Sequence, residues 1–283
     1  MMNLDLHCDY TTVGHVTIDV LEDGTRRAGG TAFYSALQAA RLGMRALIIT
    51  RGLAREIEQL LDPYRDELEL RILPAQHTTT LQTLGAGSTR RQRVLAWAGP
   101  IAEDLALDTG ILHLAPVARE TPSRWRGRTS FVGLTPQGLV REWRRAGGEI
   151  AVGAPARSAA VVAERCQAIV VSEHERAGCA SLIATAKTAG AVVAVTAGAE
   201  PSTILTPDGA SVELEVPAIE QPGDDLGAGD VFAAAFFVAL VEGQPPLQAA
   251  SFANAAAAVR MRGPDASAIG GRAEIEQRLH ATA

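Results

Sequence analysis

A glycine-rich acidic turn that runs into an apolar segment constrains the fold of this chain more than any other stretch. Residues 224–230 read Asp-Asp-Leu-Gly-Ala-Gly-Asp, and 231–237 are apolar and rich in alanine. Small residues let backbone N–H groups come close to an anion, and the apolar run predicts a helix that begins at the same point. Asp230 is either a capping residue of this helix or a carboxylate placed to take a proton from an alcohol that attacks a bound phosphate.

The composition fits a large globular α/β protein. The chain has 283 residues, 47% hydrophobic and 20% charged, which is too apolar for a disordered chain. Its net charge of −6 gives no indication of nucleic-acid binding. The longest apolar run, 231–241, is too short to span a bilayer, and the amino end has no leader pattern, so we expect a cytoplasmic protein without membrane contact. The scattered Cys8, Cys166 and Cys179 are expected to be free thiols.

The pattern D-x-x-G-A-G-D before an apolar helix resembles the C-terminal signature of the ribokinase-like (PfkB) carbohydrate kinases. The resemblance implies that Asp230 is the catalytic base and that Gly227, Ala228 and Gly229 form an anion hole for the transferred phosphoryl group. It also implies ATP as the phosphoryl donor and Mg²⁺ as its companion ion. The chain departs from the family pattern at Leu226, beside the anion hole.

Two segments near the amino end are candidates for the acceptor site. Residues 10–19 are rich in β-branched side chains and predict a first strand that ends near Asp19. Ligands of open α/β sheets gather at such strand ends, although an acid there is also a common turn residue. The resemblance implies that Asp19 accepts hydrogen bonds from sugar hydroxyls. It also implies that Gly29 and Gly30, which open a predicted helix over 31–43, let the backbone approach the substrate.

Two polar, strand-like segments interrupt an otherwise regular alternation of strands and helices. Residues 15–28 contain an Asp-Gly turn signal and predict a hairpin, and 77–97 are rich in threonine. Neither has the continuous apolar character of a strand that is covered on both faces. Together they resemble the small β-lid over the sugar site of this family, through which a homodimer could also form. We expect one ribokinase-like domain over 1–283.

A buried-type strand over 168–172 delivers Glu175 to its carboxyl end. The family pattern at this place is N-x-x-E, and it implies that Glu175 helps to hold the magnesium–phosphate assembly through water. Ser172 replaces the family asparagine. The alternative is that these acids occupy the first turn of a helix, where its dipole favours them.

The strand over 191–196 ends in a turn that resembles the nucleotide-binding V-T-x-G pattern of the family. The resemblance assigns Thr196 and Gly198 to the triphosphate, although Glu200 departs from the pattern. A long alanine-rich helix over 247–261 would cover the adenine side, with Asn254 as the expected polar lining residue.

Further segments complete the expected alternation. Short apolar runs predict strands, 53–61 predict a helix, and 139–152 fit either a helix or a hairpin, of which we favour the hairpin. His113 lies inside one predicted strand and is expected to be a core residue. The predicted strands in this group cover 46–50, 68–73, 111–116 and 130–134.

These patterns predict an α/β fold with a doubly wound, mostly parallel sheet, helices on both faces and a small β-lid. The implied activity is transfer of the γ-phosphoryl group of ATP to a hydroxyl of a sugar or cyclitol. Tyr34 stands where the family often has asparagine, which weakens the expectation of a ribose pocket. A nucleoside acceptor is an alternative, because Phe33 and Tyr34 could stack on a base. A non-catalytic sugar- or nucleotide-binding regulator is another.

Overall fold

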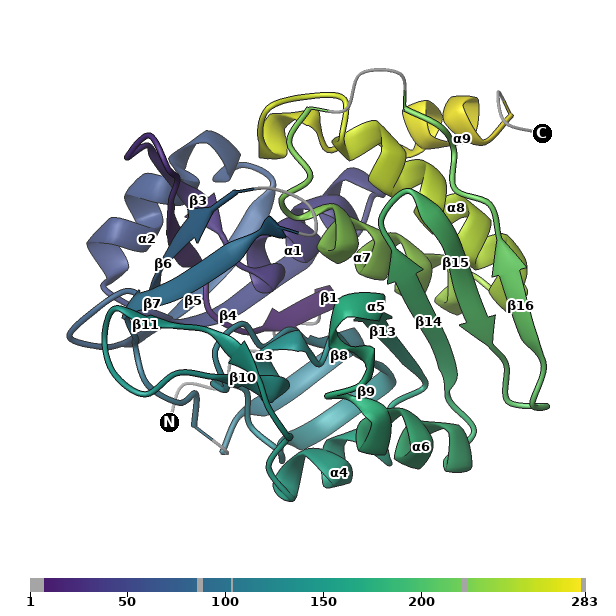
Figure 1. The fold of residues 1–283 in the computed structure, drawn as a ribbon, viewed down its shortest axis with the longest axis horizontal. Coiled ribbons are helices and arrows are strands. Elements are labelled where there is room, and N and C mark those ends of the chain that lie inside the picture. Colours follow the sequence, from purple (N-terminus) through teal and green to yellow (C-terminus); the bar gives the residue numbers. More distant parts are fainter. Residues whose placement is uncertain (1–7, 86–88, 103, 220–222, 281–283) are drawn as a thin grey trace.

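A nine-stranded sheet forms the centre of the molecule, and a separate five-stranded sheet stands next to it (Figure 1). The structure, a computed structural model, describes residues 8–85, 89–102, 104–219 and 223–280. The order of the large sheet is β16-β15-β14-β13-β9-β8-β1-β4-β5. Its strands from β5 to β14 run parallel, whereas β15 and β16 are antiparallel. The strands are β1 (Cys8–Val13), β4 (Ala46–Gly52), β5 (Leu68–Pro74), β8 (Ala106–Leu114), β9 (Arg126–Leu134), β13 (Ala168–Ser172), β14 (Val192–Ala197), β15 (Glu200–Leu205) and β16 (Ser211–Leu214).

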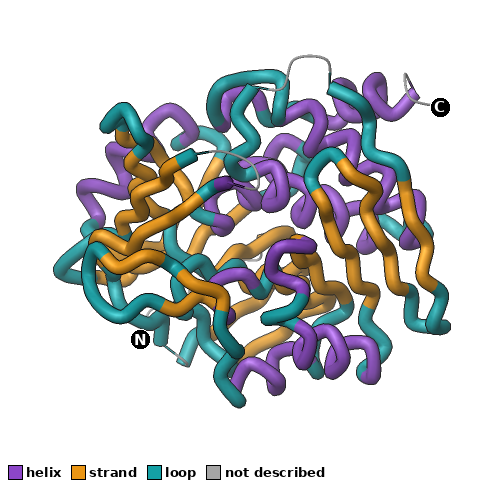
Figure 2. The backbone as a smooth tube through the Cα atoms, in the orientation of Figure 1, coloured by secondary structure: helices purple, strands orange, loops and turns teal. Residues whose placement is uncertain are grey.

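Helices cover both faces of this sheet (Figure 2). Successive side chains of a strand point to opposite faces, so Ile48 of β4 packs in the cluster that contains α1, α2, α7 and α8, while Leu47 packs in the cluster of α4 and α6. The strands β13 and β14 are apolar over almost their whole length, as expected for strands covered on both faces. The helices are α1 (Thr31–Arg41), α2 (Ala54–Leu61), α3 (Gln137–Val140), α4 (Ser158–Ala163), α5 (Glu173–Arg176), α6 (Ala180–Thr188), α7 (Ala228–Val241), α8 (Pro246–Arg260) and α9 (Arg272–His280), with 3₁₀ turns at Asp62–Tyr64 and Ala266–Ala268.

The five-stranded sheet contains strands from both segments that the sequence assigns to a lid. Its order is β11-β7-β6-β2-β3, where β2 is Thr17–Val20, β3 Arg26–Gly29, β6 Thr80–Leu84, β7 Arg91–Ala96 and β11 Gly148–Glu149. Leu81 and Val94 are buried on its inner face, where they pack against Val117 and Ala118. This apolar cluster is small, so the sheet has little core of its own.

The expected single strand over 10–19 is wrong, because the chain leaves the large sheet at Gly14 and enters the small one at Thr17. A Cβ at Gly14 would lie 2.1 Å from the carbonyl oxygen of Ala115, so only glycine fits this crossing. The backbone N–H of His15 donates to Oε1 of the fully buried Glu120 at 2.8 Å. Asp19 therefore lies within β2 and not at the end of the first strand.

The hairpin predicted over 15–28 is present, whereas the one favoured for 139–152 is present only in part, because β11, which begins at Gly148 and pairs with β7, lies between its two strands. β2 and β3 pair antiparallel across the Asp-Gly turn, and β10 (Arg141–Glu142) pairs antiparallel with β12 (Ala151–Val152). A helical turn, α3, precedes the second hairpin. The antiparallel strands β15 and β16 were not predicted, because each is short and only partly apolar.

The expectations for His113 and the cysteines are confirmed. His113 is fully buried, its Nδ1 and Nε2 lie 2.9 Å and 3.0 Å from the hydroxyls of Tyr10 and Thr135, and burial lowers its pKa to about 3. The three cysteines are buried free thiols. Within the described part of the chain, no helix is both long and apolar enough to cross a membrane.

Candidate active site

The turn at 224–227 leads directly into α7 and fixes the start of that helix. Asp224 Oδ1 accepts a hydrogen bond from the N–H of Leu226 at 3.0 Å, and the carbonyl of Asp225 accepts one from the N–H of Ala228 at 3.2 Å. Gly227 has φ +82°, and a Cβ there would lie 2.4 Å from the Tyr34 ring. Glycine is therefore required at this position by both backbone conformation and space.

The first turn of α7 has the features of an anion-binding site. The leading N–H groups of a helix have no carbonyl partner four residues earlier, and the helix dipole adds partial positive charge there. A Cβ at Gly229 would meet no atom of the described residues within 4 Å, so this part of the backbone faces open space. The predicted anion-hole residues Gly227, Ala228 and Gly229 are thus brought together at one helix end.

Asp230 lies half-buried in the same turn. Its Oδ1 is 3.3 Å from Nε2 of Gln137, and Thr31 also donates a hydrogen bond to it. Burial raises the pKa of Asp230 to about 7, against the lowering effects of Thr31 and Arg141, and the negative charge of Glu175 contributes to the rise. A carboxylate with this pKa can accept a proton near neutral pH.

Asp19 is 3% exposed and lies against the backbone of Gly29. Thr17 donates a hydrogen bond to Asp19 Oδ1 at 2.7 Å, and a Cβ at Gly29 would lie 2.1 Å from Asp19 Oδ2. Burial raises the pKa of Asp19, while the Thr17 hydrogen bond and the charge of Arg27 act in the opposite direction. The structure thus brings two predicted acceptor residues, Asp19 and Gly29, into contact.

Gly30 and Tyr34 stand at the start of α1. Gly30 has φ +92°, and a Cβ there would lie 2.3 Å from the carbonyl oxygen of His15. Tyr34 is 1% exposed, and its hydroxyl has no hydrogen-bond partner among the described residues. Phe33 is fully buried in the core. The expectation that Phe33 and Tyr34 offer a stacking surface to a base is therefore wrong, because neither ring is accessible.

The predicted donor-side residues lie on neighbouring strands. Ser172 and Thr196 are paired in register on β13 and β14, and Gly198 turns the chain toward β15 with φ +69°. Ser172 Oγ donates a hydrogen bond of 2.5 Å to Glu175, which is 9% exposed. Because Glu175 raises the pKa of Asp230, the two carboxylates belong to one electrostatic site.

Asn254 lies apart from these residues, in the interior of α8. It is 4% exposed, and its Nδ2 donates to Ser202 Oγ at 3.0 Å and to the carbonyl of Glu215 at 3.4 Å. Its amide N–H groups are therefore already used within the protein. Glu200, which departs from the nucleotide-binding pattern of the family, is the first residue of β15.

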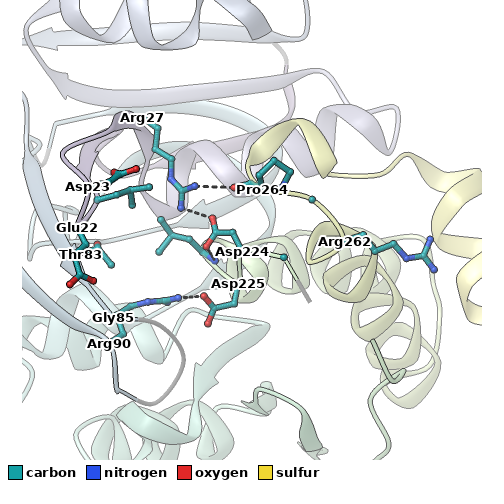
Figure 3. Close-up of a pocket in the computed structure, with 14 residues that line it drawn as sticks. Glu22, Asp23, Arg27, Thr83, Gly85, Arg90, Asp224, Asp225, Arg262 and Pro264 are labelled. Carbon is teal, nitrogen blue, oxygen red and sulfur yellow. Dashed lines mark hydrogen bonds and ion pairs between the residues drawn. The ribbon is translucent and has the colours of Figure 1, made fainter. Parts of the chain in front are cut away.

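An open cavity of about 690 Å³ lies between the small sheet and the turn before α7 (Figure 3). Two arginines of the lid segments reach across it, since Arg27 pairs with Asp224 and Arg90 pairs with Asp225. Arg27 also donates to the carbonyl of Pro264 at 3.0 Å. Asp19, Tyr34 and Asp230 are not among the residues that line this cavity. The lining residues are Leu21, Glu22, Asp23, Arg27, Thr83, Gly85, Arg90, Gly223, Asp224, Asp225, Leu226, Arg262, Gly263 and Pro264.

The sequence interpretation missed Gln137 and Arg141, which stand one helical turn apart beside Asp230. Gln137 Nε2 also donates to the Thr31 hydroxyl, and Arg141 Nη2 donates to Gln137 Oε1 at 3.2 Å. Arg141 is the cation that lowers the pKa of both Asp230 and Asp19. Gln137 follows the carboxyl end of β9, and the rule that ligands gather at strand ends could have identified it. Nothing in the sequence indicated Arg141.

Comparisons with known proteins agree with this architecture. Residues 158–269 match the model of the pfkB family carbohydrate kinases. A pyrophosphate-dependent kinase in the ribokinase family, solved with a pyrophosphate analog and myo-inositol, is 22% identical, with a TM-score of 0.75 over 95% of this chain and 99% of that chain. Arabidopsis thaliana ribokinase, complexed with ribose and ATP, is 18% identical, with a TM-score of 0.72 over 97% and 99%.

A third solved structure extends the range of acceptors among these neighbours. Burkholderia thailandensis nucleoside kinase, in complex with inosine, is 16% identical, with a TM-score of 0.77 over 96% of this chain and 97% of that chain. A comparison with curated proteins gave no significant match. The resemblance found in the sequence is confirmed: the chain has the ribokinase fold, and its residues 158–269 carry the sequence pattern of the pfkB carbohydrate kinases.

Proposed function

We propose that this protein is a kinase that transfers the γ-phosphoryl group of ATP to a hydroxyl of a sugar or cyclitol. The observation that carries the proposal is the position of Asp230 in the first turn of α7, next to the glycine-rich turn and with its pKa raised to about 7. A base beside an anion-binding helix end is the arrangement that phosphoryl transfer to an alcohol requires.

In the proposed mechanism, Asp230 takes the proton of the attacking hydroxyl. Thr31 and Gln137 hold its carboxylate through their hydrogen bonds and so restrict where the proton can be received. The N–H groups of Gly227 and Gly229 stabilise the charge on the transferred phosphoryl group, whereas that of Ala228 already donates to the carbonyl of Asp225. Such donors contribute more in a partly water-excluded site than they would in water. Arg141 adds positive charge near the same carboxylates.

The acceptor is held on the opposite side by Asp19 and the backbone of Gly29 and Gly30. The oxygens of Asp19 can accept hydrogen bonds from two neighbouring hydroxyls, which favours a polyhydroxylated acceptor. The unpaired Tyr34 hydroxyl lies near Asp19, whose charge raises the pKa of this phenol. We propose that the five-stranded sheet acts as a lid that excludes water when the acceptor is bound.

The residues present fit Mg²⁺–ATP at the phosphate end. Mg²⁺ takes oxygen ligands and usually keeps several waters, binding through one or two carboxylates and substrate phosphates. Glu175, fixed by Ser172 and electrostatically linked to Asp230, can take that part through water. When bound, the ion would neutralise charge that develops on the phosphates. Thr196 and Gly198 would contact the triphosphate.

Pyrophosphate is a second candidate donor, and a specific observation favours it. Asn254, the residue expected to line an adenine site, is buried and uses its amide N–H groups on Ser202 and Glu215. A pyrophosphate donor needs no contact of this kind. The pyrophosphate-dependent kinase described above matches this chain across nearly its whole length.

A nucleoside acceptor and a non-catalytic regulator remain as alternatives. The nucleoside kinase neighbour supports the first, and the departures at Leu226, Ser172 and Glu200 motivate the second.

We also propose that a homodimer forms through the small sheet, because β3 lies at its edge and offers unpaired backbone groups to a second copy. Light scattering on the protein with and without acceptor tests the dimer, and a monomer in both conditions would exclude it.

A turnover assay that crosses two donors with three acceptor classes tests these proposals. ATP and pyrophosphate are each combined with panels of sugars, cyclitols and nucleosides, with Asp230→Asn as the control for background hydrolysis. We expect product from a sugar or cyclitol with ATP, and product from pyrophosphate alone would identify the second donor. Ligand binding without turnover in any combination would show that the protein is a regulator.

A further inference from the structure

The guanidinium of Arg260 lies at the centre of a cage of oxygen atoms beneath the turn before α7. The side chain is 0% exposed and comes from the last residue of α8. Its Nη1 donates to the carbonyls of Asp224 and Gly263, both at 3.2 Å. Its Nη2 donates to the carbonyl of Leu226 at 2.8 Å and to Asp224 Oδ2 at 3.3 Å. Three carbonyls and one carboxylate thus surround a single buried positive charge.

This cage controls the orientation of the first anion-hole residue. A peptide unit is planar and trans, so its C=O and N–H point in opposite directions. The carbonyl of Leu226 and the N–H of Gly227 belong to the same peptide unit. By holding that carbonyl, Arg260 directs the Gly227 N–H away from itself, toward the side on which α7 begins.

A second arginine, which belongs to the small sheet, also pairs with the carboxylate of Asp224. Arg27 pairs with Asp224 Oδ2, which is also 3.3 Å from Arg260 Nη2. The two cations differ in origin, because Arg260 belongs to the large layered body and Arg27 to β3. Arg260 also donates to the backbone carbonyls of Asp224 and Leu226, whereas the hydrogen bond of Arg27 to this turn goes to the Asp224 side chain.

We infer that Arg260 is a positioning residue for phosphoryl transfer, which holds the turn 224–227 in its anion-binding conformation and takes the place that an exchangeable monovalent metal ion could occupy. The inference rests on the proposed kinase function. Carbonyl and carboxylate oxygens are ligands that suit such cations. Here a permanently charged side chain fills the cage, so turnover should not depend on which monovalent cation the buffer contains.

The first test uses the unmodified protein and needs no variant. Turnover is measured at one ionic strength in tetramethylammonium, sodium and potassium chloride. Because the three salts screen charges equally at one ionic strength, we expect the three rates to agree within about twofold. A stimulation by potassium of about tenfold or more over tetramethylammonium would overturn the inference.

The second test replaces the cation. Arg260→Met removes the charge at similar length, Arg260→Lys keeps the charge without the fork, and Arg272→Met is the control for loss of an arginine elsewhere. We expect Arg260→Met to lower kcat by about 10²-fold, the usual effect of misplacing one donor of an oxyanion site, with little change in the acceptor KM. Added guanidinium or potassium ions should restore part of this loss. Wild-type kcat in Arg260→Met would overturn the inference.

Two further readings keep the test decisive. Thermal unfolding is recorded first. If Arg260→Met does not fold, Arg260→Lys is measured in its place, and an unchanged kcat in that variant counts against the inference.

If no donor and acceptor pair gives turnover, the proposed function fails, and pyrophosphate binding is measured by calorimetry instead. The inference then predicts tighter binding to the wild type than to Arg260→Lys, by about tenfold, in tetramethylammonium; equal binding would reject it.

Discussion

The two sheets of this protein are held in place in different ways. The nine-stranded sheet is buried by helices on both faces, and α7, which carries Asp230, lies inside its larger apolar cluster. The five-stranded sheet rests on a small cluster around Leu81 and Val94 and on the ion pairs of Arg27 and Arg90. The proposed base therefore belongs to a firmly packed body, and the proposed acceptor ligand Asp19 belongs to a weakly anchored one.

This difference separates two tasks. A base must be held accurately with respect to the phosphoryl group, which a long buried helix provides. An acceptor must enter and leave, and a sheet with few apolar contacts can move at low cost in free energy. Changes made in one of the two bodies should therefore affect one task and leave the other almost unaltered.

The largest expected effect comes from the packed body. Asp230→Asn should lower kcat by about 10²–10⁴-fold, because it removes the general base while keeping the shape of the side chain. Acceptor and donor affinities, measured by calorimetry, should stay close to the wild type. Asp208→Asn, in the exposed turn between β15 and β16, is the matched control. Near-normal kcat in Asp230→Asn would mean that another group takes the proton.

A smaller effect is expected on the side of the small sheet. Asp19→Ala should weaken acceptor binding by about 10–100-fold, since hydrogen bonds to a charged group contribute about 1.5–3 kcal/mol. Donor binding, titrated separately, should change little. Asp23→Ala, exposed in the same hairpin, is the control. If only the donor affinity fell, Asp19 would belong to the donor end of the site and not to the acceptor end.

The pH dependence of kcat should follow the ionisation of the proposed base, Asp230. With the pKa of Asp230 raised to about 7, the reactive carboxylate form becomes scarcer by about tenfold for each pH unit below 7, and kcat should fall accordingly. The same raised pKa means that the folded state favours the protonated form, so its contribution to stability is full at low pH and is lost as the pH rises through 7. The stability of Asp230→Asn relative to the wild type should therefore increase as the pH rises toward 7 and stay constant above it. Equal stability curves for the two proteins would contradict the raised pKa.

Amide hydrogen exchange should distinguish the two sheets directly. On adding the true acceptor, exchange in β2, β3, β6 and β7 should slow by about tenfold, because the acceptor gives the small sheet a surface to pack on. The buried strands β4 and β14 serve as internal references and should change much less. Uniform protection of all six strands, or no protection of the small sheet, would show that it is not a lid.

The smallest expected effect concerns the ion pair of Arg90 and Asp225, which are 25% and 29% exposed. A double-mutant cycle with Arg90→Gln and Asp225→Asn should give a coupling of about 0.5–1 kcal/mol, seen as a two- to fivefold change in acceptor KM that weakens with salt. The exposed pair of Arg128 and Asp108 on the large sheet is the control. A coupling of zero would leave the small sheet held by its apolar contacts and Arg27.

The sequence predicted the packed body well, because its signals are local. The apolar runs of β4, β13 and β14 and the alanine-rich pattern of α8 each follow from burial of the segment itself. The helix start after the turn at 224–227 was also predictable, since small residues before an apolar run indicate a helix N-terminus.

The relations between distant segments could not be predicted. The ion pair of Arg27 and Asp224 joins residues 197 positions apart, and nothing in either neighbourhood indicates the other. The break at Gly14 was missed because β1 and β2 are both rich in β-branched residues, and the close approach of the Ala115 carbonyl to Gly14 comes from a segment about 100 positions away. The burial of Phe33 and Tyr34 depends on α7 packing against α1, which lies almost 200 residues away.

The crossing at Gly14 has a consequence for the way this chain folds during synthesis. β1 is an interior strand of the large sheet and pairs with β4 on one side and with β8 on the other, while the N–H of His15 donates to Glu120, 105 residues later. A nascent chain that has emerged only as far as β5 therefore leaves one edge of β1 unpaired. Such an edge is a template for pairing with other chains until β8 arrives. The edge of β1 that faces β8 in the finished sheet is thus protected only after β8 has been synthesised.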